Sequence, residues 1–292
     1  MRLNHKGHKE HEERRIMKND GPRTRKERKR GGRASFLILL SSFFVLFVSF
    51  VVRPSSGQDK KKPDKKAEPK VLVVIPLGAA PGKTTRVTIR GLRLETATAV
   101  NFPTAKATIK IVSKGKAAVP DKNPEKVGDT QIVAEVTLPA DVPGGTLPFT
   151  VLTPAGETKS HPLLIETVLP VIAEKEPNEG FRQAQPIRIP QVVDGLIERP
   201  KDVDVFRLEG KAGQRLVCEV HAARHGSALD SILTLYDAEG QQLALNDDFG
   251  GSLDSRLEVT LPRDGGYFLS LIDAHDTGGP AHVYRLVVRA TK

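Results

Sequence analysis

From residue 71 onward the chain is a succession of short β-type runs separated by turns, and this pattern restricts the fold more than any other feature. The runs alternate apolar and polar residues or are rich in β-branched side chains, and Gly and Pro stand between them. After residue 58 no segment shows the 3.6-residue apolar period of an amphipathic helix. Such runs are typical of β-sandwiches, and a length of 292 residues corresponds to about two domains. The sequence therefore predicts an all-β protein with two β-sandwich domains.

The first β-rich region covers residues 71–167. Its predicted strands are 71–75, 86–90, 99–102, 108–112, 131–138, 147–152 and 161–166. The region resembles the IPT/TIG immunoglobulin-like family, in which a G-x-x-x-x-V-T-I-x-G opening precedes A-x-x-V-x-F and a late P-x-G turn. The corresponding segments here are 82–91, 97–102 and 154–156. The resemblance implies an immunoglobulin-like β-sandwich. The Lys- and Pro-rich stretch 114–128 departs from the family pattern and is predicted to be a mobile insertion.

The segment 78–84, Gly-Ala-Ala-Pro-Gly-Lys-Thr, imitates a phosphate-binding loop but fails two of its requirements. That loop needs four residues between its glycines, and three stand between Gly78 and Gly82. It must also open a helix, whereas 85–90 alternates as a strand does. We therefore expect no nucleotide binding.

The second β-rich region, 168–292, follows a short link at 167–175 and contains eight predicted strands. They are 186–197, 203–209, 215–221, 232–237, 243–246, 256–261, 267–272 and 283–289. Short alternating strands in this number fit a jelly-roll-like β-sandwich.

Short motifs in this second region resemble the bacterial pre-peptidase C-terminal (PPC) family. The family pattern is E-P-N, then D-x-D-x-F after the first strand, then L-Y-D-x-x-G, N-D-D and D-S-x-L, and a late strand that opens with Gly and Tyr. The matching segments are 176–178, 202–206, 235–240, 246–248, 254–257 and 266–269. Order and spacing agree over roughly 171–292. The resemblance implies a jelly-roll-like module of the kind that usually accompanies a peptidase or another catalytic domain.

Two groups of oxygen-bearing side chains flank the predicted strand 186–197. They are Glu174, Glu176 and Asn178 before the strand and Asp202 and Asp204 after it. Oxygen-only ligands suit Ca²⁺, which takes about six to eight oxygen atoms in proteins. In related PPC domains acidic residues at such positions hold Ca²⁺, and this resemblance carries over best to Glu176, Asn178 and Asp204. The alternative is that these side chains cap turns beside Pro and Gly.

A second oxygen-rich loop offers further candidate ligands for a cation. They are Asn246, Asp247, Asp248 and Asp254. Gly250 and Gly251 in the same loop favour a wide hairpin turn over a second cation site.

The formal net charge of +10 is confined to the N-terminal quarter of the chain. Residues 1–33 contain 13 Lys or Arg and 5 Asp or Glu, whereas 71–292 contain 25 basic and 27 acidic residues. A nucleic-acid-binding domain carries its basic charge on a folded face. The composition therefore predicts a basic, disordered tail at 1–33 and no nucleic-acid partner.

Residues 34–52 form an uncharged apolar run that, as a helix, would reach about 28 Å, close to the thickness of a bilayer core. Basic residues precede this run, which places the N-terminus in the cytoplasm. Segment 34–57 is therefore either a cleaved signal peptide or a retained membrane anchor, and both options export the rest of the chain. The Lys- and Pro-rich segment 58–70 is predicted to be a flexible linker.

The sequence contains no G-x-S-x-G, H-E-x-x-H or kinase motif, so we expect no catalytic activity from this chain. The single cysteine, Cys218, alternates with polar neighbours and is predicted to be buried in a core. We predict an exported, calcium-stabilised binding or adhesion module whose ligand is a protein or a cell-surface polymer. The alternative is an accessory module that targets or stabilises a separately encoded secreted peptidase. No cofactor other than Ca²⁺ is expected.

Overall fold

The computed structural model describes residues 68–120 and 122–291, which belong to one compact unit spanning 61–292. Within these ranges nearly all regular structure is strand, and the helical pieces are the four-residue α1 (Pro124–Val127) and the 3₁₀ turn η1 (Ala223–His225). The predicted all-β class is therefore confirmed.

Among the described residues, no helix combines the length and apolarity that crossing a membrane requires. The predicted tail 1–33, the signal or anchor segment 34–57 and most of the linker 58–70 lie outside the described ranges.

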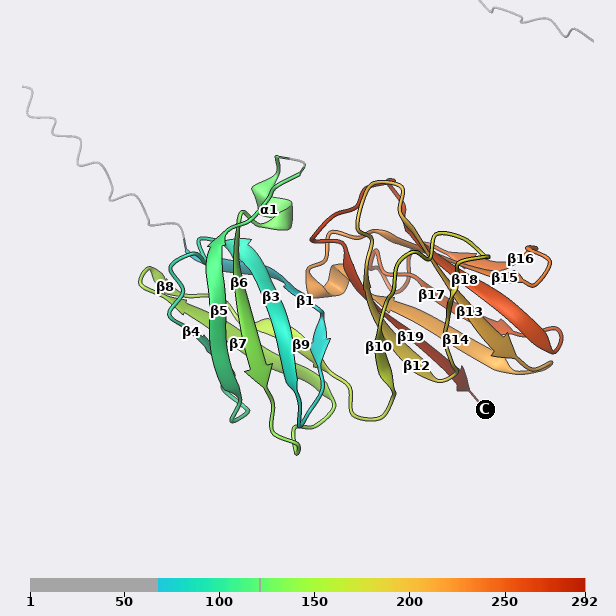
Figure 1. The fold of residues 1–292 in the computed structure, drawn as a ribbon, viewed down its shortest axis with the longest axis horizontal. Coiled ribbons are helices and arrows are strands. Elements are labelled where there is room, and N and C mark those ends of the chain that lie inside the picture. Colours follow the sequence, from blue (N-terminus) through green and yellow to red (C-terminus); the bar gives the residue numbers. More distant parts are fainter. Residues whose placement is uncertain (1–67, 121, 292) are drawn as a thin grey trace, which may run out of the picture. The chain divides into compact units, whose positions relative to one another are not determined.

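Strands β1 to β9 form two sheets that enclose one apolar core. One sheet has the strand order β1-β3-β6-β5, and the other has the order β2-β9-β7-β4 with β8 paired to β7. Strands β5, β6 and β3 lie side by side in Figure 1. The bounds are β1 Lys70–Ile75, β2 Gly78–Ala79, β3 Thr84–Leu92, β4 Ala99–Asn101, β5 Thr108–Lys116, β6 Thr130–Thr137, β7 Gly145–Thr153, β8 Gly156–Glu157 and β9 His161–Ile165.

The alternation seen in the sequence explains how this core forms. In β6 every second side chain is buried, and Ile132, Ala134 and Val136 point into the core. Phe149 and Leu163 of the opposite sheet belong to the same buried cluster. These strands thus make a β-sandwich, while the immunoglobulin-like assignment of this region stays a prediction.

The stretch predicted to be a mobile insertion, 114–128, is held to the sandwich by a buried arginine. Its first residues extend β5, and its last turn forms α1. Arg90 of β3 is only 3% exposed. Its Nε donates to Val127 O at 2.9 Å, and its Nη2 donates to Ala118 O at 2.7 Å and to Gly128 O at 3.1 Å. No local sequence pattern indicates this contact, because the donor lies 28 to 38 residues from its acceptors.

Replacing Arg90 with methionine is expected to lower the free energy of unfolding by about 2 kcal/mol, because three backbone carbonyls lose their donor. Urea denaturation followed by circular dichroism measures this loss. Arg86→Met, an exposed position on the same strand, is the matched control and is expected to change stability by less than about 0.5 kcal/mol. Equal effects of the two substitutions would contradict the role given to Arg90.

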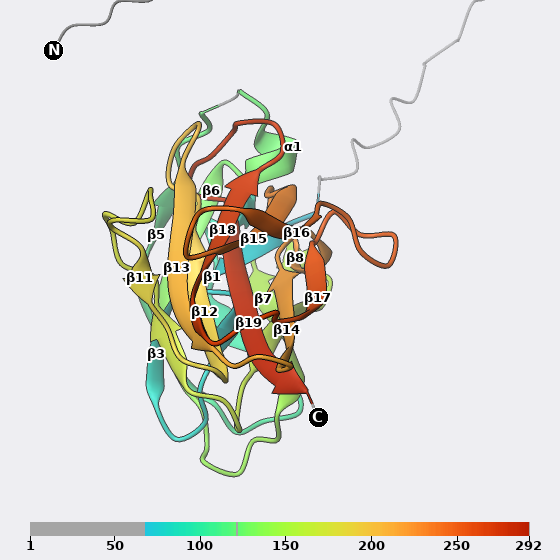
Figure 2. The same cartoon turned by 90° about the vertical axis from the view of Figure 1, so that its right-hand side faces the viewer.

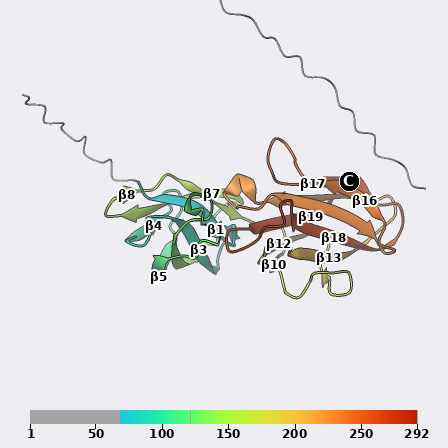
Figure 3. The ribbon, with the colours of Figure 1, turned by 90° about the horizontal axis from the view of Figure 1, so that it is seen from above.

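Strands β10 to β19 form a second pair of sheets around a second core. The orders are β10-β12-β19-β14-β17 and β11-β13-β18-β15-β16. The long strand β19 runs to the C-terminus in Figure 2, and Figure 3 gives the same strands from above. The bounds are β10 Val171–Ala173, β11 Gln185–Pro186, β12 Gln191–Leu196, β13 Val203–Gly210, β14 Arg215–His221, β15 Ser231–Asp237, β16 Gln242–Asn246, β17 Arg256–Thr260, β18 Gly265–Asp273 and β19 Val283–Thr291.

The core of this second sandwich contains apolar side chains from both sheets. Leu216 of β14 and Leu286 of β19 come from one sheet, and Phe206 of β13 and Leu269 of β18 come from the other. Cys218 lies in the same core, where burial raises the pKa of its thiol to about 12. The thiol is therefore a packed apolar group, as the alternation around it indicates.

Two sequence-based expectations about this region are wrong. The predicted single strand 186–197 is two strands, β11 and β12, which belong to different sheets. The predicted link 167–175 contains β10, which pairs in parallel with β12. The chain therefore passes from one sheet to the other three times, between β10 and β11, between β11 and β12, and between β12 and β13. The first and the third of these crossings bring the candidate ligands together. The domain boundaries at 71–167 and 168–292 stay predictions.

Candidate cation site

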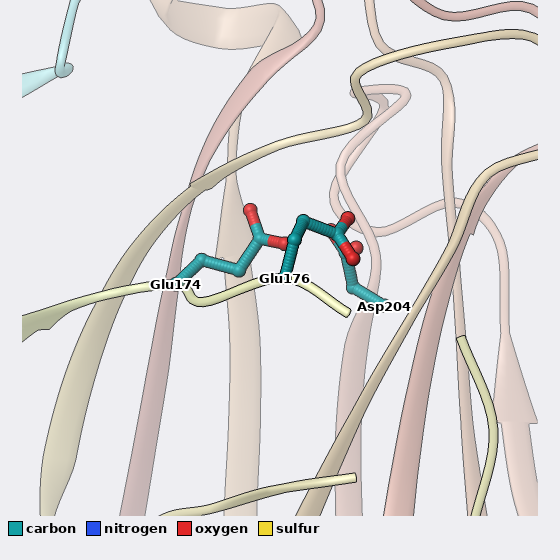
Figure 4. A group of neighbouring side chains, drawn as sticks. All are labelled: Glu174, Glu176 and Asp204. Atoms are coloured by element: carbon teal, nitrogen blue, oxygen red, sulfur yellow. The ribbon is translucent and has the colours of Figure 1, made fainter. Parts of the chain in front are cut away.

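Three of the predicted ligands converge at the crossing between the two sheets of the second sandwich. Glu174 and Glu176 follow β10, and Asp204 is the second residue of β13. One carboxylate oxygen from each lies within 4.8 Å of the others. Figure 4 shows the three side chains directed toward one another. The two sequence segments thus meet in space, as the prediction required.

Backbone and side-chain hydrogen bonds hold the two glutamates and Asn178 in place. The Glu174 carboxylate accepts from Leu196 N and from Asn178 Nδ2, both at 2.9 Å. The Glu176 carboxylate accepts from Asn178 N at 3.0 Å. Asn178 O accepts from Val205 N at 3.1 Å, which ties the loop to β13. The loop is therefore ordered by its hydrogen bonds to β12 and β13.

Burial and mutual repulsion make this group of carboxylates unfavourable as free anions. Burial raises the pKa of Glu174 and of Glu176. Burial and the neighbouring charge of Glu174 raise the pKa of Asp204 to about 9. Within the described ranges, none of the three carboxylates forms an ion pair with a basic side chain. The site therefore favours any positive charge that reaches it, whether a proton or a cation.

Two buried oxygen atoms at the site have no hydrogen-bond donor. Asp204 and Asn178 are both fully buried, and Asp204 Oδ1 and Asn178 Oδ1 lack any partner. An unsatisfied buried acceptor is costly, and native proteins rarely leave one without an explanation. A cation bound by oxygen ligands would satisfy both atoms and neutralise the carboxylates. Glu174, Glu176, Asp204 and Asn178 therefore fit Ca²⁺, with backbone carbonyls and water completing its shell.

Asp202, the fifth predicted ligand, stands outside this group and serves a local turn. Its Oδ2 accepts from Glu198 N at 2.6 Å, and its Oδ1 lies 3.3 Å from Arg199 Nη2. Arg199 also pairs with Glu179 at 2.5 Å. Asp202 thus fixes the connection between β12 and β13 and neutralises part of Arg199.

The second oxygen-rich loop has the geometry of a turn. The Asn246 amide donates to Asp248 O at 2.9 Å and accepts from Arg256 N at 2.7 Å. Asp254 is buried away from the loop tip, where it accepts from Ala223 N at 2.6 Å and pairs with Arg224. Among the described His, Cys, Asp and Glu residues, three ligand atoms come close together at Glu174, Glu176 and Asp204, and no such group includes the aspartates of this loop.

Sequence reasoning missed one residue of the site, Tyr284. Its hydroxyl donates to Asp204 Oδ2 at 2.6 Å, and the side chain is fully buried. Burial and the charge of Asp204 raise the pKa of Tyr284 well above its ordinary value, so it is a hydrogen-bond donor at neutral pH. No local motif marks Tyr284, because it lies 80 residues from Asp204 in the chain.

No protein-family model matches the chain. Over 99 residues, 33% of its length, the chain is 42% identical to a probable subtilase-type serine protease of Deinococcus radiodurans. The match spans only 14% of that protease. The pre-peptidase C-terminal domain of a Bacillus anthracis collagenase is similar in structure, with 16% identity and a TM-score of 0.31 over 40% of this chain and 100% of that domain. PliG of Aeromonas hydrophila, a periplasmic inhibitor of g-type lysozyme, has 14% identity and a TM-score of 0.29 over 42% of this chain and 97% of PliG.

Proposed function

We propose that the chain is an exported, non-catalytic accessory module that binds Ca²⁺ and acts together with a secreted peptidase. The observation that carries this proposal is the 42% identity with part of a subtilase-type serine protease. The match spans 14% of that protease. A match this short is compatible with an accessory part of a protease that is here made as a separate chain. A β-sandwich with loops at its ends is a suitable frame for such binding.

The cation site supports the calcium part of this proposal. Its ligands join the start of the second sandwich, at Glu174 and Glu176, to Asp204 in β13. Calcium bound there would fasten the entering segment to the sheet and remove the repulsion between carboxylates. Extracellular modules of this kind bind Ca²⁺ with dissociation constants of about 0.1–1 mM, which matches calcium levels outside cells.

The export part of the proposal rests on the sequence. The apolar run 34–52 follows a basic segment, which is the arrangement of a signal peptide or an N-terminal anchor. The folded residues would then lie on the outer side of the membrane, where a secreted peptidase could meet them.

Affinity capture tests the association with a peptidase. Immobilised residues 61–292 would be incubated with the secreted proteins of the organism that makes this chain, either in 2 mM Ca²⁺ or in EDTA. Serine hydrolases that are retained would then be labelled with a fluorophosphonate probe. We expect a labelled peptidase to be retained in calcium and released in EDTA, and its half-life against autolysis to lengthen when the module is added. The Asp204→Asn module is expected to retain less of it.

The same experiment tests cell-surface adhesion, the other function predicted from the sequence. Isolated cell envelopes would be offered to the module in place of secreted proteins. Retention of a labelled peptidase with no binding to envelopes would support the accessory module. Binding to envelopes with no peptidase retained would overturn it in favour of a surface-binding protein.

A further inference from the structure

Asp204 is held in position by a partner from a distant part of the chain. The Tyr284 hydroxyl donates to Asp204 Oδ2 at 2.6 Å, in a setting where both residues are fully buried. Oδ2 is thereby occupied, and Oδ1 is the oxygen left without a donor. The hydrogen bond thus fixes which carboxylate oxygen is free to meet a cation.

A glycine makes this arrangement possible. Gly195 of β12 pairs directly with Tyr284 of β19 in the antiparallel ladder. A Cβ atom placed on Gly195 would overlap the Tyr284 ring and hydroxyl and would lie 2.8 Å from Glu174 Oε2. Any larger residue would therefore push aside both the tyrosine and the carboxylate. Glycine weakens a strand interior, so its presence here indicates a close approach of other atoms.

The residue after this glycine supports the site as well. Leu196 N donates to Glu174 Oε2 at 2.9 Å, so Gly195 and Leu196 together place Glu174 against β12. Strand β12 thus orients the Glu174 carboxylate, and strand β19, through Tyr284, orients the Asp204 carboxylate.

The geometry points to Tyr284 and Gly195 as positioning residues that prepare Glu174 and Asp204 for a divalent cation with oxygen ligands. This assignment deepens the proposed function and rests on its calcium site. The tyrosine need not touch the cation, because it acts through Asp204. Hydrogen bonds to metal-binding carboxylates restrict their rotation, and losing such a partner typically weakens metal binding by about 10–100-fold.

Calorimetric titration of residues 61–292 with CaCl₂ tests this role. Tyr284→Phe removes one hydroxyl and keeps the ring, and it is expected to weaken calcium binding at least about tenfold. Tyr267→Phe is the matched control. Tyr267 is also a buried tyrosine of the same core, and its hydroxyl donates to Arg263 O at 2.6 Å, away from the site. We expect Tyr267→Phe to bind calcium as the unsubstituted protein does.

A spectroscopic measurement separates positioning from general loss of stability. The chain contains three tyrosines and no tryptophan, so its near-ultraviolet circular dichroism reports largely on tyrosine. Calcium is expected to change this signal in the unsubstituted protein and in Tyr267→Phe, and to change it much less in Gly195→Ala, which keeps all three tyrosines. Gly195→Ala is expected to weaken calcium binding to a similar degree while far-ultraviolet circular dichroism still shows a folded β protein.

The possible outcomes are distinguishable. Equal calcium affinities of the unsubstituted protein and Tyr284→Phe would overturn the positioning role and leave the calcium site standing. A similar loss in Tyr267→Phe and Tyr284→Phe would also overturn it, because both would then act through core stability. No calcium heat from the unsubstituted protein would overturn the calcium site together with this assignment, whatever the result of the peptidase capture.

Discussion

Replacing Asp204 with asparagine is expected to abolish the stabilisation of residues 61–292 by calcium without destabilising the calcium-free protein. Asparagine has the shape of aspartate and can still accept the hydrogen bond from Tyr284. With a pKa of about 9, the Asp204 carboxyl is protonated in the calcium-free protein at neutral pH, so asparagine replaces one neutral group with another. No basic side chain among the described residues pairs with Asp204. The calcium-free protein therefore keeps a neutral group where burial and the charge of Glu174 disfavour an anion, while one carboxylate ligand for the cation is lost.

Thermal unfolding in EDTA and in excess calcium measures both effects. A ligand at about 100 times its dissociation constant stabilises the folded state by about 2.7 kcal/mol. For a protein of this size that corresponds to a rise in Tm of about 5–10 °C. We expect this rise in the unsubstituted protein and none in Asp204→Asn, whose Tm in EDTA should be equal or higher.

Asp247→Asn serves as the control for this experiment. Asp247 is an exposed carboxylate of the second oxygen-rich loop, and its loss should leave the calcium-dependent rise unchanged. A rise that disappears in Asp247→Asn and persists in Asp204→Asn would move the cation to that loop and refute the site described above.

The features that the sequence predicted are those that depend on neighbouring residues. Strand β6 could be predicted because its buried residues alternate without a break from Thr130 to Thr137. The meeting of Glu174, Glu176 and Asp204 was expected because short acidic motifs flank a β-type run, although this run forms two strands of different sheets, β11 and β12. Both inferences use local spacing, and neither requires knowledge of which strands pair.

The features that the sequence did not predict depend on pairing between distant strands. Tyr284 reaches Asp204 because β19 lies beside β12 in a particular register, which no short motif encodes. Strand β10 has three residues and forms only through its contact with β12. Asp202 was expected to be a ligand because it stands two residues from Asp204. In the structure the nearby amide of Glu198 engages one of its carboxylate oxygens, Oδ2, and Oδ1 lies 3.3 Å from Arg199 Nη2, so local contacts compete with metal binding there.

Acid is expected to destabilise the protein through His161 of β9, and replacing this residue should remove part of that loss. His161 is largely buried, its ring meets the edge of Phe149 at 5.6 Å between centroids, and its Nε2 has no hydrogen-bond partner. Burial, and to a lesser extent the nearby His225, lower the pKa of His161 to about 4. A proton on Nε2 would lie in a buried position without a hydrogen-bond acceptor.

The direction of the pH effect follows from the two states of the chain. In the unfolded chain His161 binds a proton below about pH 6.5, whereas in the folded protein it does so only near pH 4. The contribution of neutral His161 to stability is therefore complete above pH 6.5 and is lost as the pH falls from 6.5 toward 4. Between pH 7.5 and 4.5 this single group should lower the free energy of unfolding by about 2–3 kcal/mol.

Urea denaturation of residues 61–292 at pH 7.5, 6.0 and 4.5 measures the loss, with His161→Phe and His275→Phe beside the unsubstituted protein. His275 is a matched control because its side chain is 71% exposed. His161→Phe cannot take up a proton, so its stability should fall by about 2–3 kcal/mol less than that of the unsubstituted protein over this range. His275→Phe should follow the unsubstituted protein closely. Because His161→Phe and the unsubstituted protein share every other titrating group, their comparison isolates His161. Parallel pH profiles for His161→Phe and the unsubstituted protein would show that this histidine is not an acid-sensitive element of the fold.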